Sequence, residues 1–237
     1  MNLLDLLFPK TCVGCKRFGS YFCGECVKEI KQGELVCPFC ERASLGGVVH
    51  AVCKRKFGLD GLWSLGVYEG HLRVAIQKLK YKWVSEIAKE LVDVTIEYWA
   101  KNSPVLLDKI KKDQGRSWIV TAVPLHPTRQ NWRGFNQSEL LGKLFAFKLG
   151  LKYETVLKRV RNTTPQMKLL SHERKQNIKN AFELAGSNQF SAVSRQLSDV
   201  NILLIDDVWT TGSTLKECGY MLKRGGAESV WALTIAR

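Results

Sequence analysis

The stretch VNILLIDDVWTTGST, residues 200–214, decides the fold of this chain. Its apolar run ends at two adjacent carboxylates, Asp206 and Asp207, and a short run of Thr, Gly and Ser precedes a helical pattern. An unbroken apolar run of this kind is typical of a strand buried on both faces of a parallel sheet. Open α/β sheets bind their ligands at the carboxyl ends of the strands, so we expect the two aspartates to lie in a binding site.

The loop after the aspartates predicts a phosphate-binding turn, because a turn at a helix N-terminus offers backbone N–H groups to an anion. It is not a Walker loop, since no Gly-Lys-Ser/Thr closes it, and one glycine cannot supply a dinucleotide fingerprint. Carboxylates beside a phosphate cradle indicate a phosphorylated polyol such as a phosphorylated ribose. The alternative is an ordinary buried strand with a polar turn. Burying two carboxylates costs folding free energy, however, so their presence here favours a functional role. The loop residues are Thr210, Thr211, Gly212, Ser213 and Thr214.

This segment resembles the thirteen-residue motif of the type I phosphoribosyltransferases: four apolar residues, two aspartates, two variable residues and TTGST. The resemblance implies that residues 210–214 hold the 5-phosphate of phosphoribosyl pyrophosphate (PRPP). It also implies that Asp206 and Asp207 contact the ribose hydroxyls, with magnesium (Mg²⁺) chelating pyrophosphate and ribose oxygens. Trp209 is bulkier than the residue expected at that position.

Seven of the eight cysteines fall in the first 53 residues, in knuckles of the form Cys-x-x-Cys or His-x-x-Cys. This spacing aims two ligands at one tetrahedral ion, so four knuckles predict two structural zinc (Zn²⁺) sites. Pairing of sequence-adjacent knuckles is the simplest arrangement, and an interleaved one stays open. The eighth cysteine, Cys218, lies in a helical pattern and is expected to be a small core residue. The predicted ligands are Cys12, Cys15, Cys23 and Cys26 in one site, and Cys37, Cys40, His50 and Cys53 in the other.

The remainder of the chain alternates strand and helix patterns, which predicts an α/β fold with a parallel sheet. We expect a zinc-ribbon domain over residues 1–57 and a phosphoribosyltransferase-like domain over residues 58–237. A loop is expected over 124–136, a short helix and loop over 106–116, a helical turn over 1–8 and a surface excursion over 186–198. The expected strands cover 62–68, 118–123, 156–160, the apolar run before Asp206, and 228–237, and the expected helices cover 71–81, 84–99, 137–149, 171–180 and 214–224.

A second block, PLHPTRQNWRGFNQ at residues 124–137, leaves the end of a predicted buried strand. Together with RVRNTTPQ at 159–166, ER at 173–174 and the knuckles, it resembles the ComF family, competence-associated proteins with a phosphoribosyltransferase domain. In type I phosphoribosyltransferases the corresponding early loop grips pyrophosphate, and the guanidinium forks of Arg129 and Arg133 match phosphate oxygens. His126 either contacts a phosphate or caps the turn, and Asn136 and Gln137 are candidates to orient the loop.

The chain is basic, with 36 Lys and Arg against 22 Asp and Glu and a formal net charge of +14. Residues 124–180 hold twelve of the basic residues and three acidic ones. Such a surplus attracts polyanions, and a solubilising surface would scatter it more evenly. Arg159, Arg161 and Arg174 are candidates for a second anion site, which the ComF resemblance extends to single-stranded DNA; Arg174 can equally pair with a core carboxylate.

Three functions follow as alternatives. The first is handling of single-stranded DNA during natural transformation, with PRPP as a bound ligand and with Trp132 and Phe135 stacking on bases. The second is transfer of the phosphoribosyl group to an unidentified nitrogen acceptor, with Asp206, Asp207 and Arg133 as catalytic candidates. The third is a zinc-ribbon scaffold that docks partners such as the DNA-uptake machinery. We expect a cytoplasmic protein, because neither a secretory signal nor a membrane span is visible.

Overall fold

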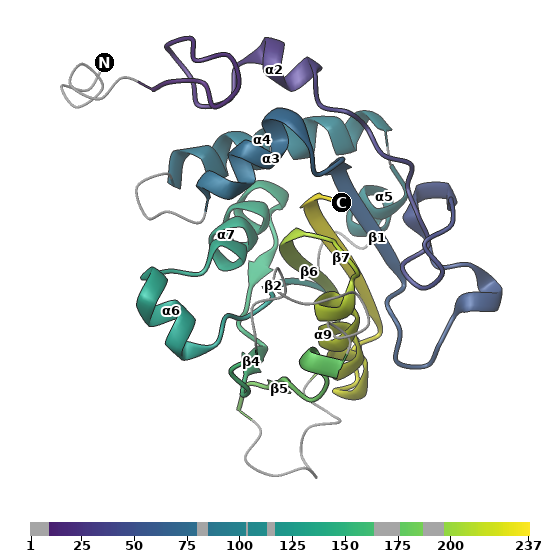
Figure 1. The fold of residues 1–237 in the computed structure, drawn as a ribbon. Coiled ribbons are helices and arrows are strands. Elements are labelled where there is room, and N and C mark those ends of the chain that lie inside the picture. Colours follow the sequence, from purple (N-terminus) through teal and green to yellow (C-terminus); the bar gives the residue numbers. More distant parts are fainter. Residues whose placement is uncertain (1–9, 80–84, 103, 113–116, 164–175, 187–196) are drawn as a thin grey trace.

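A five-stranded parallel sheet forms the centre of the molecule (Figure 1). The computed structural model describes residues 10–79, 85–102, 104–112, 117–163, 176–186 and 197–237. Every neighbouring pair of strands in this sheet is parallel, as the sequence predicts. The strand order is β1 (Gly61–Gly66), β7 (Ser229–Ala236), β6 (Asn201–Val208), β2 (Trp118–Ala122) and β3 (Lys152–Tyr153).

The β6 strand is buried on both faces, which explains its unbroken apolar sequence. Leu203 and Ile205 belong to the hydrophobic core on one face of the sheet. Ile202 and Leu204 belong to a separate core on the opposite face. The strand also runs through both aspartates to Val208, further than the apolar run alone indicates.

Helices cover both faces of the sheet (Figure 1). One face packs against α3 (Gly70–Lys78), α4 (Ser85–Asn102), α5 (Pro104–Lys112) and α7 (Gln137–Leu149). The other packs against α9 (Ser213–Arg224), where Cys218 is fully buried, as expected. All five agree with the predicted helices to within a few residues. No helix in the described ranges is long and apolar enough to cross a membrane.

One local prediction is wrong, and one predicted strand forms outside the parallel sheet. The segment after β2 is not all loop, because α6 (Pro127–Arg133) forms there, with Pro127 at its start and Gly134 at φ 79° ending it. The predicted strand at 156–160 does not join the parallel sheet. It forms β4 (Leu157–Arg159), which pairs antiparallel with β5 (Phe182–Leu184), and the parallel edge is taken by the two residues of β3.

Some predictions concern residues outside the described part of the chain. They are the helical turn at 1–8, most of the surface excursion at 186–198, the first half of the helix at 171–180, and Arg174. Of the helix predicted at 171–180, residues 176–178 are described and are helical.

The N-terminal segment contains little regular structure and is organised around two clusters of ligand atoms. It includes α2 (Gly24–Lys28) and the single turns η1 (Leu45–Gly47) and η2 (Ala51–Cys53). Within each cluster the four ligand atoms all lie within 4.8 Å of one another, and the pairing is between sequence-adjacent knuckles, as predicted. A tetrahedral zinc site with bonds of about 2.3 Å needs sulfur atoms about 3.8 Å apart, so both clusters fit zinc.

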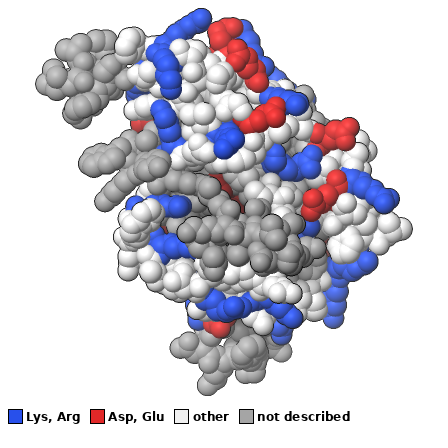
Figure 2. All heavy atoms as spheres, viewed as in Figure 1, with Lys and Arg blue, Asp and Glu red and all other residues white. Residues whose placement is uncertain are grey.

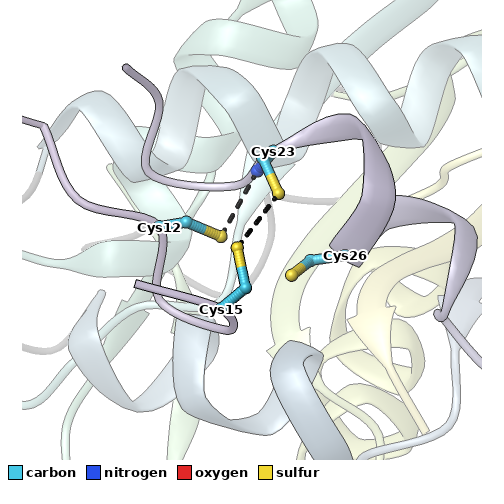
Figure 3. A group of neighbouring side chains, drawn as sticks. All are labelled: Cys12, Cys15, Cys23 and Cys26. Carbon is cyan, nitrogen blue, oxygen red and sulfur yellow. Dashed lines mark hydrogen bonds between the residues drawn. The ribbon is translucent and has the colours of Figure 1, made fainter. Parts of the chain in front are cut away.

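The first cluster is formed by four cysteines whose side chains point toward one another (Figure 3). The Sγ atoms of Cys15 and Cys23 are 3.5 Å apart, and the backbone N–H of Cys23 lies 3.5 Å from Cys12 Sγ. Burial raises the pKa of Cys12, but backbone N–H groups of Cys23, Cys15 and Gly14 outweigh burial and lower it to about 6. These N–H groups therefore favour the thiolate form of Cys12, the form that binds metal.

The second cluster includes His50, the one non-cysteine member. Its Nδ1 lies 3.4 Å from Cys40 Sγ, and its Nε2 lies 3.0 Å from the carbonyl oxygen of Ala43. A carbonyl oxygen only accepts, so this contact places the proton on Nε2 and leaves the Nδ1 lone pair facing the cysteines. A backbone acceptor on the far nitrogen is the usual support for a metal-bound histidine.

We predict that this chain binds two zinc ions and that His50→Ala retains one, because each cluster supplies four ligands. Elemental analysis of purified protein measures both values. Cys218→Ala is the matched control: it removes a thiol outside the clusters and should retain two zinc ions. A fully folded protein without zinc would contradict this prediction.

Candidate functional site

The acid pair at the end of β6 is hydrogen bonded to the start of α7. Ser138 Oγ donates to Asp206 Oδ1 at 2.7 Å, and Gln137 Nε2 donates to Asp207 Oδ2 at 3.2 Å. These residues are about 70 positions apart in the chain. The structure thus brings together the two blocks that stand out in the sequence.

Asn136 positions the start of α7. Its Oδ1 accepts from the backbone N–H of Ser138 at 3.0 Å, which caps the helix, and its Nδ2 donates to the carbonyl of Val123 at 3.0 Å. Val123 directly follows β2, the neighbour of β6 in the sheet. Because Asn136 is buried and satisfied on both sides, it fixes the helix start against the carboxyl edge of the sheet.

The two arginines of the same block have different partners. Arg133 donates from Nη1 to Gln137 Oε1 at 2.6 Å, so a chain of hydrogen bonds runs from Arg133 through Gln137 to Asp207. Arg129 donates to the carbonyl of Thr163. Burial lowers the pKa of Arg129, and the nearby charge of Arg133 lowers it further. His126 caps α6 by accepting from Thr128 N–H at 3.3 Å, which supports the capping role.

Arg159 lies inside the molecule rather than on its surface. It is 8% exposed, and its guanidinium donates to the Thr163 hydroxyl and lies 5.4 Å from the centre of the Phe182 ring. Burial lowers its pKa, as does the charge of Arg129. Arg129 and Arg159 therefore both donate hydrogen bonds to Thr163. Arg161, by contrast, is exposed and donates to the carbonyl of Lys179.

Arg159 is buried, whereas Arg129 and Arg133 are half-buried. The charge of Asp206 acts on Arg159 from beyond salt-bridge distance. None of the salt bridges between described residues includes Arg129, Arg133 or Arg159. Cations that are partly or fully kept from water without a paired carboxylate are costly, so this cluster is suited to an anionic ligand.

The carboxyl of Asp206 is electrostatically unfavourable in its ionised form. Burial raises the pKa of Asp206 from its ordinary value of 3.8 to about 7, and the charge of Asp207 acts in the same direction. The hydrogen bond from Ser138 opposes this shift without cancelling it. A perturbed carboxyl at a sheet edge is typical of a functional site, where a cation or a donor group completes its environment.

Trp209 explains the conformation of the loop that follows. Gly212 has φ +66°, and a Cβ atom there would lie 2.1 Å from the indole of Trp209. Only glycine fits this position, so the bulky Trp209 buttresses the turn from inside the core, where it is 1% exposed. The loop then opens α9, and the hydroxyls of Thr211 and Ser213 are 2.8 Å apart at its start.

Sequence reasoning missed Ser138 and Thr163. Ser138 directly follows Gln137 at a predicted helix start, so its position was a usable signal. Thr163 had no such signal, because its role depends on β4 bringing it beside Arg129.

We predict that Asp206→Asn stabilises the protein at pH 8. The pKa of Asp206 is higher in the folded chain than in the unfolded chain, so folding loses stability as the pH rises from about 4 to 7. Each pKa unit corresponds to about 1.4 kcal/mol, so the variant should gain at least about 1 kcal/mol at pH 8. This gain should vanish near pH 4.

Urea denaturation at both pH values measures this difference. Asp93→Asn is the control, because Asp93 is an exposed carboxylate paired with Lys148 at 2.6 Å. Equal stabilities of wild type and Asp206→Asn at pH 8 would show that the carboxyl is not strained.

The chain is similar over most of its length to several curated proteins. It is 30% identical to Competence protein F of Haemophilus influenzae, over 95% of this chain and 90% of that protein. It is 31% identical to DNA utilization protein YhgH of Salmonella typhi, over 89% and 88% of the two chains. It is 25% identical to Competence protein ComFC of Bacillus subtilis, over 85% and 78%.

No protein-family model matches the sequence. The similarity to these relatives, over 85–95% of this chain, nevertheless agrees with the resemblance carried by the knuckles, the arginine block and the acid pair. The chain belongs to the ComF family.

Proposed function

We propose that this protein binds PRPP at the carboxyl edge of β6 and handles single-stranded DNA during DNA uptake. The observation that carries the first part is the meeting of an acid pair with a group of arginines beside the N-terminus of α9. PRPP has the matching parts: a 5-phosphate, a ribose with two free hydroxyls, and a pyrophosphate.

Each part of PRPP has a proposed partner. The 5-phosphate accepts hydrogen bonds from residues 210–214 at the start of α9. The ribose hydroxyls donate to Asp206 and Asp207. The pyrophosphate neutralises Arg129 and Arg133, whose guanidinium groups suit phosphate oxygens. Mg²⁺ would be held by the ligand's oxygens beside the acid pair and would supply positive charge there.

The part of the proposal that concerns DNA is supported by the relatives and by the surface. The similar proteins are named for competence and for DNA utilization. Lys and Arg side chains are spread over the face drawn in Figure 2, with acidic side chains among them. Arg161 is exposed and Trp132 is 85% exposed, so both can reach a strand, whereas Arg159 is buried and Phe135 half-buried. In this proposal residues 1–57 and 58–237 are two domains of a cytoplasmic protein.

Transfer of the phosphoribosyl group is the second candidate, favoured by the hydrogen-bonded path from Arg133 to Asp207. Arginines that hold pyrophosphate also stabilise it as a leaving group. Pyrophosphate release from PRPP, measured with a panel of nucleobases and with or without single-stranded DNA, distinguishes turnover from binding alone.

We predict that Asp206→Asn combined with Asp207→Asn abolishes Mg²⁺-dependent PRPP binding, because the ribose hydroxyls and the metal both lose their anionic partners. Isothermal titration calorimetry with and without Mg²⁺ measures the affinity, which should fall at least a hundredfold. Asp93→Asn should bind PRPP like the wild type. Unchanged affinity in the double variant would reject the site.

We predict that the affinity for a single-stranded oligonucleotide falls steeply with salt. Each neutralised phosphate contributes a slope of about −0.7 to the plot of log affinity against log salt. Arg161→Ala should make the slope shallower by about that amount, and Lys101→Ala, at the end of α4, should leave it unchanged. Fluorescence anisotropy between 50 and 300 mM salt gives the slopes, and a flat wild-type response would argue for the scaffold function instead.

A further inference from the structure

A groove separates the second ligand cluster from α9, and of its lining residues only Ser213 belongs to the PRPP site proposed above. Its volume is about 500 Å³. One wall is formed by Phe39, Arg55 and Phe57, and the other by Ser213, Lys216 and Tyr220. A volume of this size is typical of pockets that hold small organic groups.

The wall contributed by α9 is one continuous face of the helix. The lining positions 213, 216, 217 and 220 have the spacing of successive turns, so they line up along the groove. The groove therefore begins at Ser213, in the loop that opens α9, and extends away from it to Tyr220.

The opposite wall is held by the second ligand cluster. Phe39 lies between Cys37 and Cys40, and Cys53 itself lines the groove. Lys216 of α9 forms an ion pair with Glu41 at 3.0 Å, directly after this knuckle. The folded cluster and this ion pair fix Phe39 at the mouth of the groove.

The groove combines accessible aromatic rings with cations. Phe39 is 51% exposed and Tyr220 is 38% exposed. The guanidinium of Arg55 lies 4.7 Å from the centre of the Phe39 ring, and Lys56 Nζ lies 5.3 Å from that of Phe57. Phe57 and Tyr220 meet edge to face at 5.6 Å, so the aromatic surface is continuous from one wall to the other.

The charge of the groove is positive. Its nearby acids already have partners, because Glu41 pairs with Lys216 and Glu217 accepts from the backbone N–H of Asn180 at 2.8 Å. Arg55 and Lys56 take part in none of the salt bridges between described residues. Their charges are therefore available to a polyanion.

The geometry points to this groove as the place where single-stranded DNA binds, with bases stacked on Phe39 and Tyr220 and phosphates held by Arg55 and Lys56. Aromatic faces with interleaved cations are the usual means of binding unpaired strands, because every base has a face to stack. A duplex keeps its bases stacked on one another and cannot offer them to a groove of this size. The inference rests on the DNA-handling part of the proposed function and names its site.

The test measures binding of fluorescein-labelled oligo(dT) to the whole chain of 237 residues by anisotropy at constant salt. Phe39→Ala and Tyr220→Ala should each weaken binding about five- to a hundredfold, the range expected for loss of one stacked base. Phe39→Trp should bind like the wild type, because it keeps a stacking face. Arg55→Ala should also weaken binding.

Two control variants test whether a loss of binding is specific to the groove or follows from removing any exposed aromatic or basic side chain. Phe147→Ala removes an aromatic side chain that is 81% exposed on α7, outside the groove, and Lys101→Ala removes a cation on α4. Both should bind oligo(dT) like the wild type. Zinc content and melting temperature, measured for every variant, identify a loss of binding that comes from misfolding. As a direct readout, photocrosslinking with 5-iodouracil should label the peptides that contain Phe39 or Tyr220.

The outcomes distinguish the groove from the function on which it depends. If the wild type does not bind oligo(dT), the DNA-handling proposal and the groove are both rejected. If the wild type binds, and folded Phe39→Ala and Tyr220→Ala bind equally well with crosslinks elsewhere, the groove is rejected while DNA handling stands. Weakened groove variants with unaffected controls support the inference.

Discussion

Two hydrogen bonds between the start of α7 and the acid pair of β6 are the constraint on which the candidate site depends. Ser138 and Gln137 donate to Asp206 and Asp207, and through Gln137 the same contact orients Arg133. These contacts exist because β2 and β6 are neighbours in a parallel sheet, so that the segments leaving them meet at one edge. Asn136 holds the helix start to the end of β2, which makes the arrangement rigid.

Several charged side chains without a salt-bridge partner among the described residues lie at this edge of the sheet. The half-buried Arg129 and the buried Arg159 both donate to Thr163. Burial and the charge of Asp207 raise the pKa of Asp206, although the charge of Arg159 opposes this shift. Each of these features opposes folding, since charged groups are kept from water without full compensation. The anionic groups of a ligand would pair with the arginines, and its hydroxyl groups would donate to Asp206. The unfavourable electrostatics of the site thus point to the kind of ligand that we propose.

The two ligand clusters give the N-terminal segment a structure that its short helices cannot. The first is attached to the body through Glu90 of α4, which accepts from the backbone N–H groups of Tyr21 and Phe22 at 3.1 and 2.5 Å. The second is attached through the Glu41–Lys216 ion pair to α9. This ion pair lies beside the groove, so the second ligand cluster and the helix that follows the loop at residues 210–214 together shape one surface.

The elements with strong periodicity were predictable from the sequence, because β6 and α7 depend on local pattern and capping, and residues 137–149 are helical as predicted. The knuckle spacing predicted the eight ligand positions, but it left the pairing of the knuckles open until the structure placed sequence-adjacent ones together. The antiparallel pairing of β4 with β5 was not predictable, because three-residue strands carry too little pattern. Only the tertiary structure decided that Ser138 reaches Asp206, that Trp209 lies beneath Gly212 and that Arg159 is buried. Those facts depend on which segments become neighbours across the sheet, whereas local sequence determines only what each segment can form.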